Sequence, residues 1–308
     1  MNSEAFVVVN NLSKSYQDIT ALKNISFTIN KNELFGFIGP DGAGKTSIFR
    51  ILATVLLADK GSAFINGFDV VRDYRSIRQI TGYMPGRFSL YQDLSVQENL
   101  EFFATVFGTT IEKNYELIKP VYSHIEPFKN RLARKLSGGM KQKLALSCAL
   151  IHRPEILILD EPTTGVDAVS RKEFWEMLKG LKEQGITILV STPYMDEAAL
   201  CDRVALIQQG ELMKIDTPDG IVDAYPCPLY ALQADDLYSL LLDLRQWENT
   251  RSVFAFGQEL HLTVQGSQLD ESSLAAWLNT KGHTSLKIRE IKASIEDCFM
   301  ELLITRKS

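Results

Sequence analysis

A glycine-rich loop between an apolar segment and an amphipathic one constrains the fold of this chain more than any other feature. The apolar segment at residues 34–38 is typical of a buried strand, and a helix is expected to begin at Lys45. Glycines allow the intervening backbone to curl so that successive N–H groups point inward, while the helix N-terminus adds a positive dipole. The layout predicts a phosphate-binding loop in which Lys45 reaches terminal phosphate oxygens and Thr46 binds Mg²⁺. The loop comprises Gly39, Pro40, Asp41, Gly42, Ala43, Gly44, Lys45 and Thr46.

Two carboxylates follow a second apolar segment. Residues 156–159 are Ile-Leu-Ile-Leu, and Asp160 and Glu161 come directly after them. A carboxylate at the end of a strand beside the phosphate loop can hold hydrated Mg²⁺, and we assign this role to Asp160. Glu161 is then expected to face the terminal phosphate and to polarise an attacking water as general base. For this pair taken alone, an acidic turn before a helix is an open alternative.

The composition indicates a globular protein. Of 308 residues, 45% are hydrophobic and 23% are charged, which suits one large domain and a smaller one. The formal net charge of −5, without a block of lysines or arginines, argues against nucleic acid as a partner. No apolar run has the length of a bilayer span, and no basic segment followed by an apolar one opens the sequence, so a cytoplasmic location is expected.

Apolar periodicity indicates an α/β region up to about residue 222. Strands that alternate with helices predict a parallel core sheet, three early runs predict a small, partly antiparallel sheet, and residues 94–150 are mainly helical. Ser95 and Glu98 have the spacing of a capping box. The expected strands are 6–9, 25–29, 62–66, 81–85, 156–159, 186–190 and 204–207, and the expected helices include 45–56, with Ile48, Leu52 and Val55 on its apolar stripe, and another with Phe174, Leu178 and Leu181.

The pattern changes after residue 223. Strands and helices follow one another in the order βαββαβ, which predicts a compact ferredoxin-like α+β module at residues 223–308, with a last helix at 295–303. The expected strands are 229–234, 252–256, 259–264 and 285–292, and the expected helices are 235–247 and 270–281.

A Ser-Gly-Gly turn lies between the phosphate loop and the acidic strand and precedes a strongly apolar helix. It belongs to the sequence Leu136-Ser137-Gly138-Gly139-Met140-Lys141-Gln142-Lys143. Together with the phosphate loop and the acidic strand, this turn makes residues 4–215 resemble the ATP-binding subunit of ATP-binding-cassette (ABC) transporters. An anion bound at this helix start agrees with the dipole of a helix N-terminus.

The resemblance implies a P-loop NTPase cassette that binds ATP and Mg²⁺ and acts as an ATPase. It has a parallel core sheet, an antiparallel β subdomain and a helical subdomain at about 88–150, within a domain at residues 1–222. In that family the Ser-Gly-Gly turn binds the γ-phosphate of ATP held by an opposing cassette, and an aspartate that matches Asp167 links the two sites. Tyr16 matches the aromatic that stacks on adenine. The ATP-binding residues implied are Tyr16, the loop residues 39–46 and Ser47, with Lys45 and Glu161 as catalytic residues, Thr46 and Asp160 as metal ligands, and Ser137, Gly138 and Gly139 for the partner's ATP.

Two positions depart from the family pattern. After the strand at 81–85 the family has a glutamine that contacts Mg²⁺ and the attacking water, whereas this chain has Gly86. Pro193 stands where the family has a histidine that hydrogen-bonds the γ-phosphate, and proline can neither donate nor accept that bond. Both positions belong to the composite site of this chain's own phosphate loop. We therefore expect firm ATP binding, slow hydrolysis and an intact Ser137 turn that serves a partner.

The leading hypothesis is an ATPase subunit that powers export through a separate membrane permease of the ABC-2 type. The C-terminal module, which ends with residues 293–302, resembles the tail of exporter ATPases that pair with such permeases. It implies a second cassette, with a heterodimer favoured, and a peripheral location on the inner face of the cell membrane. In the family the surface after Gly86 receives a coupling helix of the permease, for which Phe88, Leu90 and Tyr91 are candidates; packing inside the helical insertion is equally open. The alternatives are a nucleotide-dependent regulatory cassette with little hydrolysis, and a cassette protein that acts on ribosomes or DNA.

Overall fold

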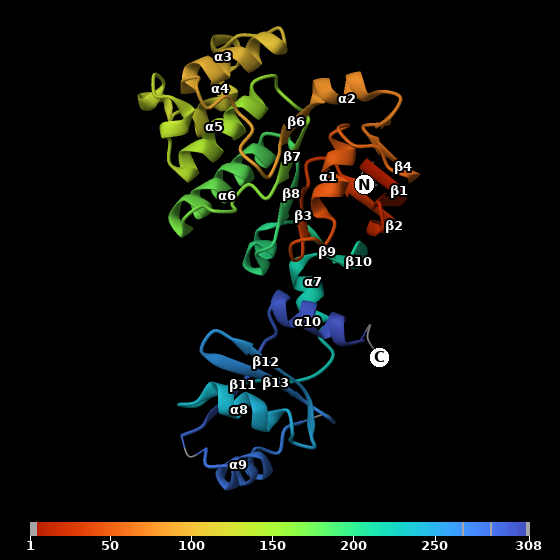
Figure 1. The fold of residues 1–308 in the computed structure, drawn as a ribbon, viewed down its shortest axis with the longest axis vertical. Coiled ribbons are helices and arrows are strands. Elements are labelled where there is room, and N and C mark those ends of the chain that lie inside the picture. Colours follow the sequence, from red (N-terminus) through yellow and green to blue (C-terminus); the bar gives the residue numbers. More distant parts are fainter. Residues whose placement is uncertain (1–4, 267, 284, 306–308) are drawn as a thin grey trace. The chain divides into compact units, whose positions relative to one another are not determined.

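The chain forms two compact units, as seen in a computed structural model that describes residues 5–266, 268–283 and 285–305. The first unit ends at Pro218 and the second begins at Asp219 (Figure 1). The helix α7, at Pro218–Asp223, spans this point of the chain.

The centre of the first unit is a six-stranded sheet in the order β10-β9-β3-β8-β7-β6. Neighbouring strands from β9 to β6 run parallel, and β10 is antiparallel to β9. Strands β3, β7 and β8 are buried along their whole length, as expected for parallel strands that are covered on both faces. The predicted parallel core sheet is confirmed. The strands are β3 Leu34–Ile38, β6 Thr81–Met84, β7 Ile156–Asp160, β8 Thr187–Thr192, β9 Arg203–Gln208 and β10 Glu211–Asp216.

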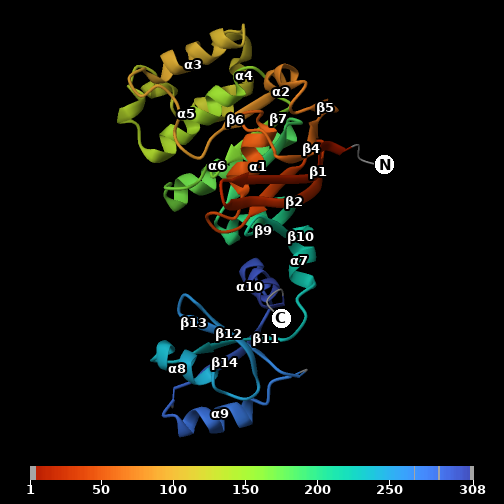
Figure 2. The ribbon, with the colours of Figure 1, turned by 45° about the vertical axis from the view of Figure 1, so that its right-hand side comes forward.

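A four-stranded antiparallel sheet, in the order β2-β1-β4-β5, forms the second layer of this unit (Figure 2). Side chains of this sheet, of β3 and of α1 share one apolar cluster, so α1 lies between the two sheets. Phe27, Phe35, Phe37 and Phe49 make ring contacts in that cluster. The predicted antiparallel subdomain is confirmed, with β1 Ala5–Tyr16, β2 Ile19–Asn30, β4 Lys60–Ile65, β5 Phe68–Asp69 and α1 Lys45–Leu52.

Helix α1 ends earlier than the sequence predicts. The expected helix at 45–56 closes at Leu52, and Thr54 has a φ of 60°, outside the helical region. Ile48 and Leu52 are buried as expected, whereas Val55 is 56% exposed and takes no part in the apolar stripe. Arg78 stabilises the turn that follows α1 by donating hydrogen bonds to the side-chain and main-chain oxygens of Thr54, at 2.8 and 2.9 Å.

Helices between residues 96 and 150 confirm the predicted helical subdomain, and two further helices complete the first unit. Ser95 caps α3 with the predicted capping box to Glu98, and Phe174, Leu178 and Leu181 of α6 are buried. Residues 88–95 precede the first helix of this subdomain and are irregular apart from an isolated bridge between Ser95 and Leu132. The helices are α2 Tyr74–Ile80, α3 Val96–Val106, α4 Ile111–Tyr122, α5 Gly138–Leu150 and α6 Ala168–Glu183, with 3-10 turns η1 Glu126–Phe128, η2 Ala133–Lys135 and η3 Met195–Leu200.

The second unit has the predicted ferredoxin-like order. Its antiparallel sheet runs β12-β13-β11-β14, and α8 and α9 supply Leu240, Leu244, Leu274 and Leu278 to a core on one face. Within the described ranges of the chain, no helix is long and apolar enough to cross a membrane. The elements are β11 Leu229–Gln233, α8 Leu237–Leu244, β12 Thr250–Phe256, β13 Glu259–Val264, α9 Glu271–Thr280, β14 Lys287–Ile291 and α10 Ile295–Thr305.

Candidate functional site

Four loops meet at one edge of the six-stranded sheet. The strands β3, β8, β7 and β6 are adjacent and parallel, so the residues after their carboxyl ends lie along the same edge. Their registers align Ile38 with Thr192, Asp160 with Ser191 and Met84 with Leu159. The sheet therefore gathers four predicted site segments that are far apart in sequence: the phosphate loop after β3, Pro193 after β8, Asp160 and Glu161 at the end of β7, and Gly86 after β6.

The phosphate loop requires glycine at two crowded positions. A Cβ on Gly39 would lie 2.1 Å from the main-chain oxygen of Ile207. Gly44 has a φ of 108°, and a Cβ there would lie 2.6 Å from the main-chain oxygen of Ala21. Gly44 is also the N-cap of α1 and provides no side-chain cap, which leaves the first turn of this helix open to an anion.

Lys45 is folded back into the loop. Its side chain is 2% exposed, and its Nζ donates to the main-chain oxygens of Gly39 and Pro40 at 2.7 and 3.0 Å. The same Nζ lies 3.2 Å from Oε1 of Glu161. The ammonium group is therefore held between the phosphate loop and the carboxylate that follows β7.

Asp160 is a buried carboxylate that is oriented by hydroxyl groups. Its Oδ1 accepts from Ser191 Oγ at 2.7 Å and from Thr46 Oγ1 at 3.2 Å, and the residue is 2% exposed. A hydroxyl and a carboxylate at this spacing suit Mg²⁺, a hard cation that keeps several water ligands and binds phosphate oxygens in such sites. The described residues hold no cluster of three or more His, Cys, Asp or Glu that would bind a metal without a phosphate ligand.

Glu161 has a constrained backbone. Its φ is 50°, which is unusual for a residue with a side chain, and its N–H donates to Ser191 O at 3.1 Å and Ser191 Oγ at 2.9 Å. Ser191 is fully buried, and it orients the carboxylate of Asp160 and the backbone of Glu161. Ser191 was not predicted as a site residue from the sequence, although its place at the end of the neighbouring parallel strand is the signal that identifies it.

Gly86 and Pro193 border this edge of the sheet. An ideal Cβ on Gly86 would lie 3.2 Å from the main-chain oxygen and 3.6 Å from Oδ2 of Asp160. Pro193 follows Thr192, whose main-chain oxygen accepts from the N–H of Gly39 at 3.4 Å. Both positions that depart from the family pattern therefore adjoin the predicted metal ligand or the phosphate loop.

Tyr16 lies at the end of β1, next to the helix that follows the phosphate loop. Its hydroxyl is 3.2 Å from Ser47 Oγ, and 42% of the residue is exposed. Lys14 Nζ lies 5.6 Å from the centre of the tyrosine ring. An exposed aromatic ring beside α1 is available for stacking.

The Ser-Gly-Gly turn and Asp167 form a second group of predicted residues. Ser137 caps α5 by accepting from Met140 N at 3.3 Å, and Asp167 caps α6 by accepting from Ser170 N at 3.0 Å, a bond that lowers the pKa of Asp167. A Cβ on Gly139 would lie 2.9 Å from Ser170 Oγ, so the two helix starts are in contact.

A salt bridge strengthens this contact between the two helices. Lys143 of α5, largely buried, donates to Glu173 of α6 at 2.7 Å. Ser137 and Asp167 themselves are exposed. The fold therefore presents both helix starts together on the surface of the first unit.

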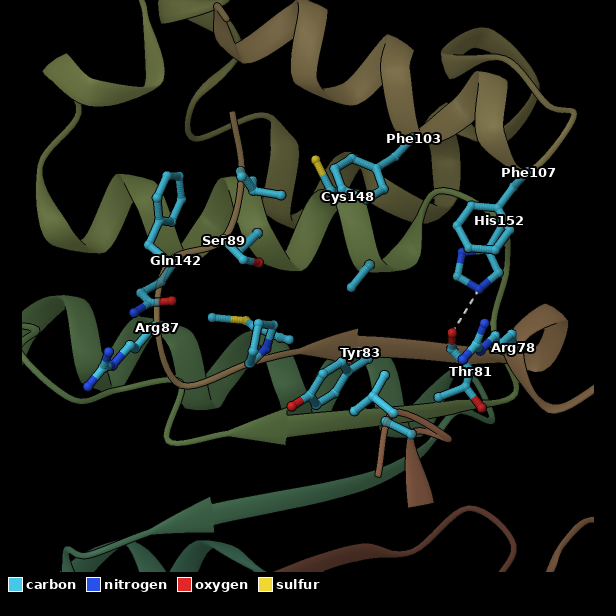
Figure 3. A pocket seen from close by; sticks show the side chains of 18 residues that line it. Arg78, Thr81, Tyr83, Arg87, Ser89, Phe103, Phe107, Gln142, Cys148 and His152 are labelled. Carbon is cyan, nitrogen blue, oxygen red and sulfur yellow. Dashed lines mark hydrogen bonds between the residues drawn. The ribbon is translucent and has the colours of Figure 1, made fainter. Parts of the chain in front are cut away.

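An apolar groove lies between β6, α3 and α5 (Figure 3). Its volume is about 400 Å³, and Phe88 and Leu90 line it, whereas Tyr91 packs edge-on against Phe102, at 4.8 Å between ring centres. Arg78 and Arg87 are among its lining residues, none of which carries a carboxylate.

His152 and Phe107 close one end of this groove. The rings stack with centres 3.8 Å apart, and His152 Nε2 lies 3.1 Å from the main-chain oxygen of Thr81 (Figure 3). Burial lowers the pKa of His152 to about 4, so the ring is neutral near pH 7 and donates from Nε2 to Thr81. This pair was not predicted from the sequence, because the two residues are 45 positions apart and join the segments after α3 and α5.

Comparison with known proteins identifies the family. The ABC transporter family model matches residues 22–164. The Nod factor export ATP-binding protein I of Burkholderia lata is 34% identical over 301 residues, which cover 95% of each chain. The chain therefore belongs to the ATP-binding proteins of ABC transporters.

Other similar proteins match a smaller share of the chain. The probable multidrug ABC transporter ATP-binding protein YbhF of Escherichia coli is 42% identical over 223 residues, covering 71% of this chain and 39% of that protein's length. A solved ATP-binding subunit of an ABC transporter has a TM-score of 0.65 at 26% identity, covering 71% of this chain and 93% of that one. A dimeric ATP-binding cassette in a post-hydrolysis state with ADP and Pi has a TM-score of 0.63 at 26% identity, covering 68% and 98%. These structures confirm the cassette fold.

Proposed function

We propose that this chain is an ATPase subunit that powers export through a separate ABC-2 type permease. The observation that carries the proposal is the row of loops along one edge of the sheet. There, Lys45 and Thr46 of the phosphate loop lie next to the carboxylates of Asp160 and Glu161. The relative named for Nod factor export supports the direction of transport.

Each group in this site has a distinct task in the proposed reaction. The loop amides and Lys45 bind phosphate oxygens, and the ring of Tyr16 stacks on adenine. Thr46 and Asp160 would hold Mg²⁺, which neutralises charge on the phosphates when bound. Glu161 accepts a proton from the attacking water as general base. The ion pair between Glu161 and Lys45 has to break before Lys45 can bind a phosphate oxygen and Glu161 can accept the proton.

A second cassette completes two composite sites in this proposal. The helix starts at Ser137 and Asp167 are both exposed, and the turn formed by Ser137, Gly138 and Gly139 would serve ATP held by the partner together with Asp167. A homodimer would carry Gly86 and Pro193 in both sites, so we favour a heterodimer in which the partner's site does most of the hydrolysis. The dimeric state named for one structural relative supports pairing of cassettes.

The same two residues support a second candidate function. Gly86 and Pro193 remove two polar side chains from the edge that holds Asp160. A regulatory cassette that closes on ATP and hydrolyses little of it would tolerate both losses. Separate measurement of ATP binding and turnover distinguishes the two functions, because only the first requires this chain to hydrolyse the ATP that it binds.

Stacking of adenine on Tyr16 has a measurable consequence. Tyr16→Ala is expected to weaken ATP binding roughly tenfold, because stacking of a base on an aromatic ring contributes about 1–3 kcal/mol. Tyr16→Phe keeps the ring and loses only the hydroxyl near Ser47, so its affinity is expected to stay within about twofold of the parent. Titration with a fluorescent ATP analogue measures both; equal affinities for the two variants would contradict stacking.

The groove is the proposed contact with the permease. Its apolar floor and its two arginines suit an amphipathic segment, and the family resemblance assigns this surface to a coupling helix. Bound in this way, the chain would lie at the inner face of the membrane. Ala145 of α5 lines the groove and is partly exposed, so a larger charged side chain there would occupy the space.

Co-purification tests the proposed partner. The full chain, tagged and extracted in mild detergent, is expected to bring down an integral membrane protein. Ala145→Glu should reduce this recovery by about tenfold, equal to about 1.4 kcal/mol, with ATP binding unchanged. Lys113→Glu, on an exposed part of α4, is the matched control and should recover the parent amount. Recovery of ribosomes without a membrane protein would contradict the proposal.

A further inference from the structure

A buried carboxylate lies just beyond the segment that contains Pro193. Glu197 of η3 is 2% exposed, and its Oε2 accepts from Thr163 Oγ1 at 3.1 Å. Its other oxygen, Oε1, accepts no hydrogen bond from any residue in the described ranges and lies 3.8 Å from Nε of Arg171. Burying a carboxylate away from any cation destabilises the fold, and Arg171 is the cation that offsets this effect for Glu197.

Arg171 contacts the rest of the same segment. The centre of its guanidinium group lies 4.7 Å from the centre of the Tyr194 ring, and its Nη2 lies 3.6 Å from Oδ2 of Asp196. One side chain from α6 therefore meets three of the four residues that follow Pro193. The contacts combine stacking on an aromatic face with two carboxylates, a combination that a planar guanidinium makes and an ammonium does not.

The same arginine belongs to the first turn of α6. Its N–H donates to the main-chain oxygen of Asp167 at 2.9 Å, so the backbone of Arg171 and that of Asp167 move together. Thr163, the other partner of Glu197, lies in the turn that connects Glu161 to Asp167, and its main-chain oxygen accepts from Val166 at 3.2 Å. The segment after Pro193 is therefore held by two residues, Thr163 in this turn and Arg171 in the first turn of α6.

We propose that Arg171 is a positioning residue that couples the two nucleotide sites of the cassette pair. This inference rests on the proposed function, in which the segment around Pro193 borders this chain's own nucleotide and Asp167 serves the partner's. A displacement of that segment when nucleotide binds is passed through Tyr194, Glu197 and Arg171 to the start of α6. The contacts of Arg171 with Tyr194 and Glu197 are the route by which the position of the segment reaches Asp167.

The ATP dependence of turnover tests the coupling. In the full chain assembled with its partner cassette, Arg171→Gln is expected to lower turnover at saturating ATP about tenfold and to reduce the Hill coefficient toward one, a size of coupling typical between sites. ATP affinity of the isolated full chain should stay within about twofold. Arg171→Lys keeps the charge and loses the planar stack, so it should fall between the parent and Arg171→Gln.

Matched variants separate coupling from a structural role. Lys172→Gln removes an exposed positive charge from the adjacent position of α6 and should behave as the parent. Tyr194→Leu removes the ring and keeps the pair between Arg171 and Glu197, so it provides a second test if Arg171→Gln does not fold.

Three outcomes would overturn the inference. Unchanged turnover and Hill coefficient in Arg171→Gln is the first, and a parallel fall of ATP affinity, thermal stability and turnover is the second, because a merely structural role predicts it. If Arg171→Gln fails to fold, parent behaviour of Tyr194→Leu is the third. A parent assembly without ATP turnover or ATP-dependent association would instead contradict the proposed function.

Discussion

Glu161→Gln is expected to lower ATP turnover at this chain's own site by at least about 100-fold, the usual contribution of a general base. Glutamine has nearly the same shape but accepts no proton from water at neutral pH. The strained backbone at residue 161 and its two bonds to Ser191 do not involve the carboxylate, so the turn should keep its geometry. ATP binding should therefore survive the change.

The contact between Glu161 and Lys45 adds a second expectation. In the structure the two charges lie 3.2 Å apart, and this pair must open before Lys45 reaches a phosphate. Glu161→Gln removes the charge that competes for Lys45, so ATP affinity is expected to rise by a few-fold, as for a partly buried ion pair worth about 1 kcal/mol. Titration with ATP measures affinity, and phosphate release measures turnover.

A matched control uses another glutamate. Glu183→Gln makes the same substitution at the exposed end of α6, away from the sheet edge, and should leave both quantities unchanged. Turnover of Glu161→Gln within a few-fold of the parent would show that another group activates the water. Loss of ATP binding would show that the carboxylate has a structural role in the loop.

Much of the fold was predictable because its signals are local. The strands β3, β7 and β8 are short apolar runs, and their burial on both faces follows from that composition. The capping box at Ser95 and Glu98 is a spacing of three residues, and it is present in the structure. The order βαββαβ after residue 223 likewise predicted the ferredoxin-like sheet.

The missed features depend on contacts between distant segments. The apolar stripe from Ile48 to Val55 predicted a longer α1, but Arg78 bonds to Thr54 and the helix ends at Leu52. No periodicity links those residues, which are 24 apart. Tertiary hydrogen bonds therefore overrode the helical pattern.

The site shows the same division. Motifs within one loop, such as residues 39–46, were predicted from the residue types that bind phosphate. Ser191 and Arg171 were not predicted, because each makes its contact with a residue on another strand or helix. The roles assigned to Tyr16 and Asp167 stay predictions, with their positions now described.

Gly86→Gln combined with Pro193→His is expected to raise turnover by about 10- to 100-fold, because a single donor in a transition state contributes about 100-fold. The position of Gly86 suits the change. A Cβ there would point at the carboxylate of Asp160, 3.6 Å from Oδ2, where a glutamine amide could reach a bound metal or water. Its 3.2 Å distance to the main-chain oxygen of Asp160 is tight and requires a small backbone shift.

Histidine at 193 restores a donor on the adjacent loop. The main-chain oxygen of Thr192 accepts a hydrogen bond from the N–H of Gly39, so residue 193 is close to the start of the phosphate loop. Proline fixes φ and biases Thr192 to extended geometry, which β8 already has, and its replacement frees the backbone without breaking the strand. Each single variant should give a smaller gain than the pair, since the two groups act on the same phosphate.

The double variant is best judged against a background without the general base. Adding Glu161→Gln should remove the gain, because the restored donors stabilise a reaction that Glu161 initiates. Phosphate release at saturating ATP measures turnover, and titration with ATP confirms that the site is filled. Unchanged turnover with ATP bound would mean that Gly86 and Pro193 do not limit hydrolysis, and the low-activity site would then have another cause, such as the pairing of Lys45 with Glu161.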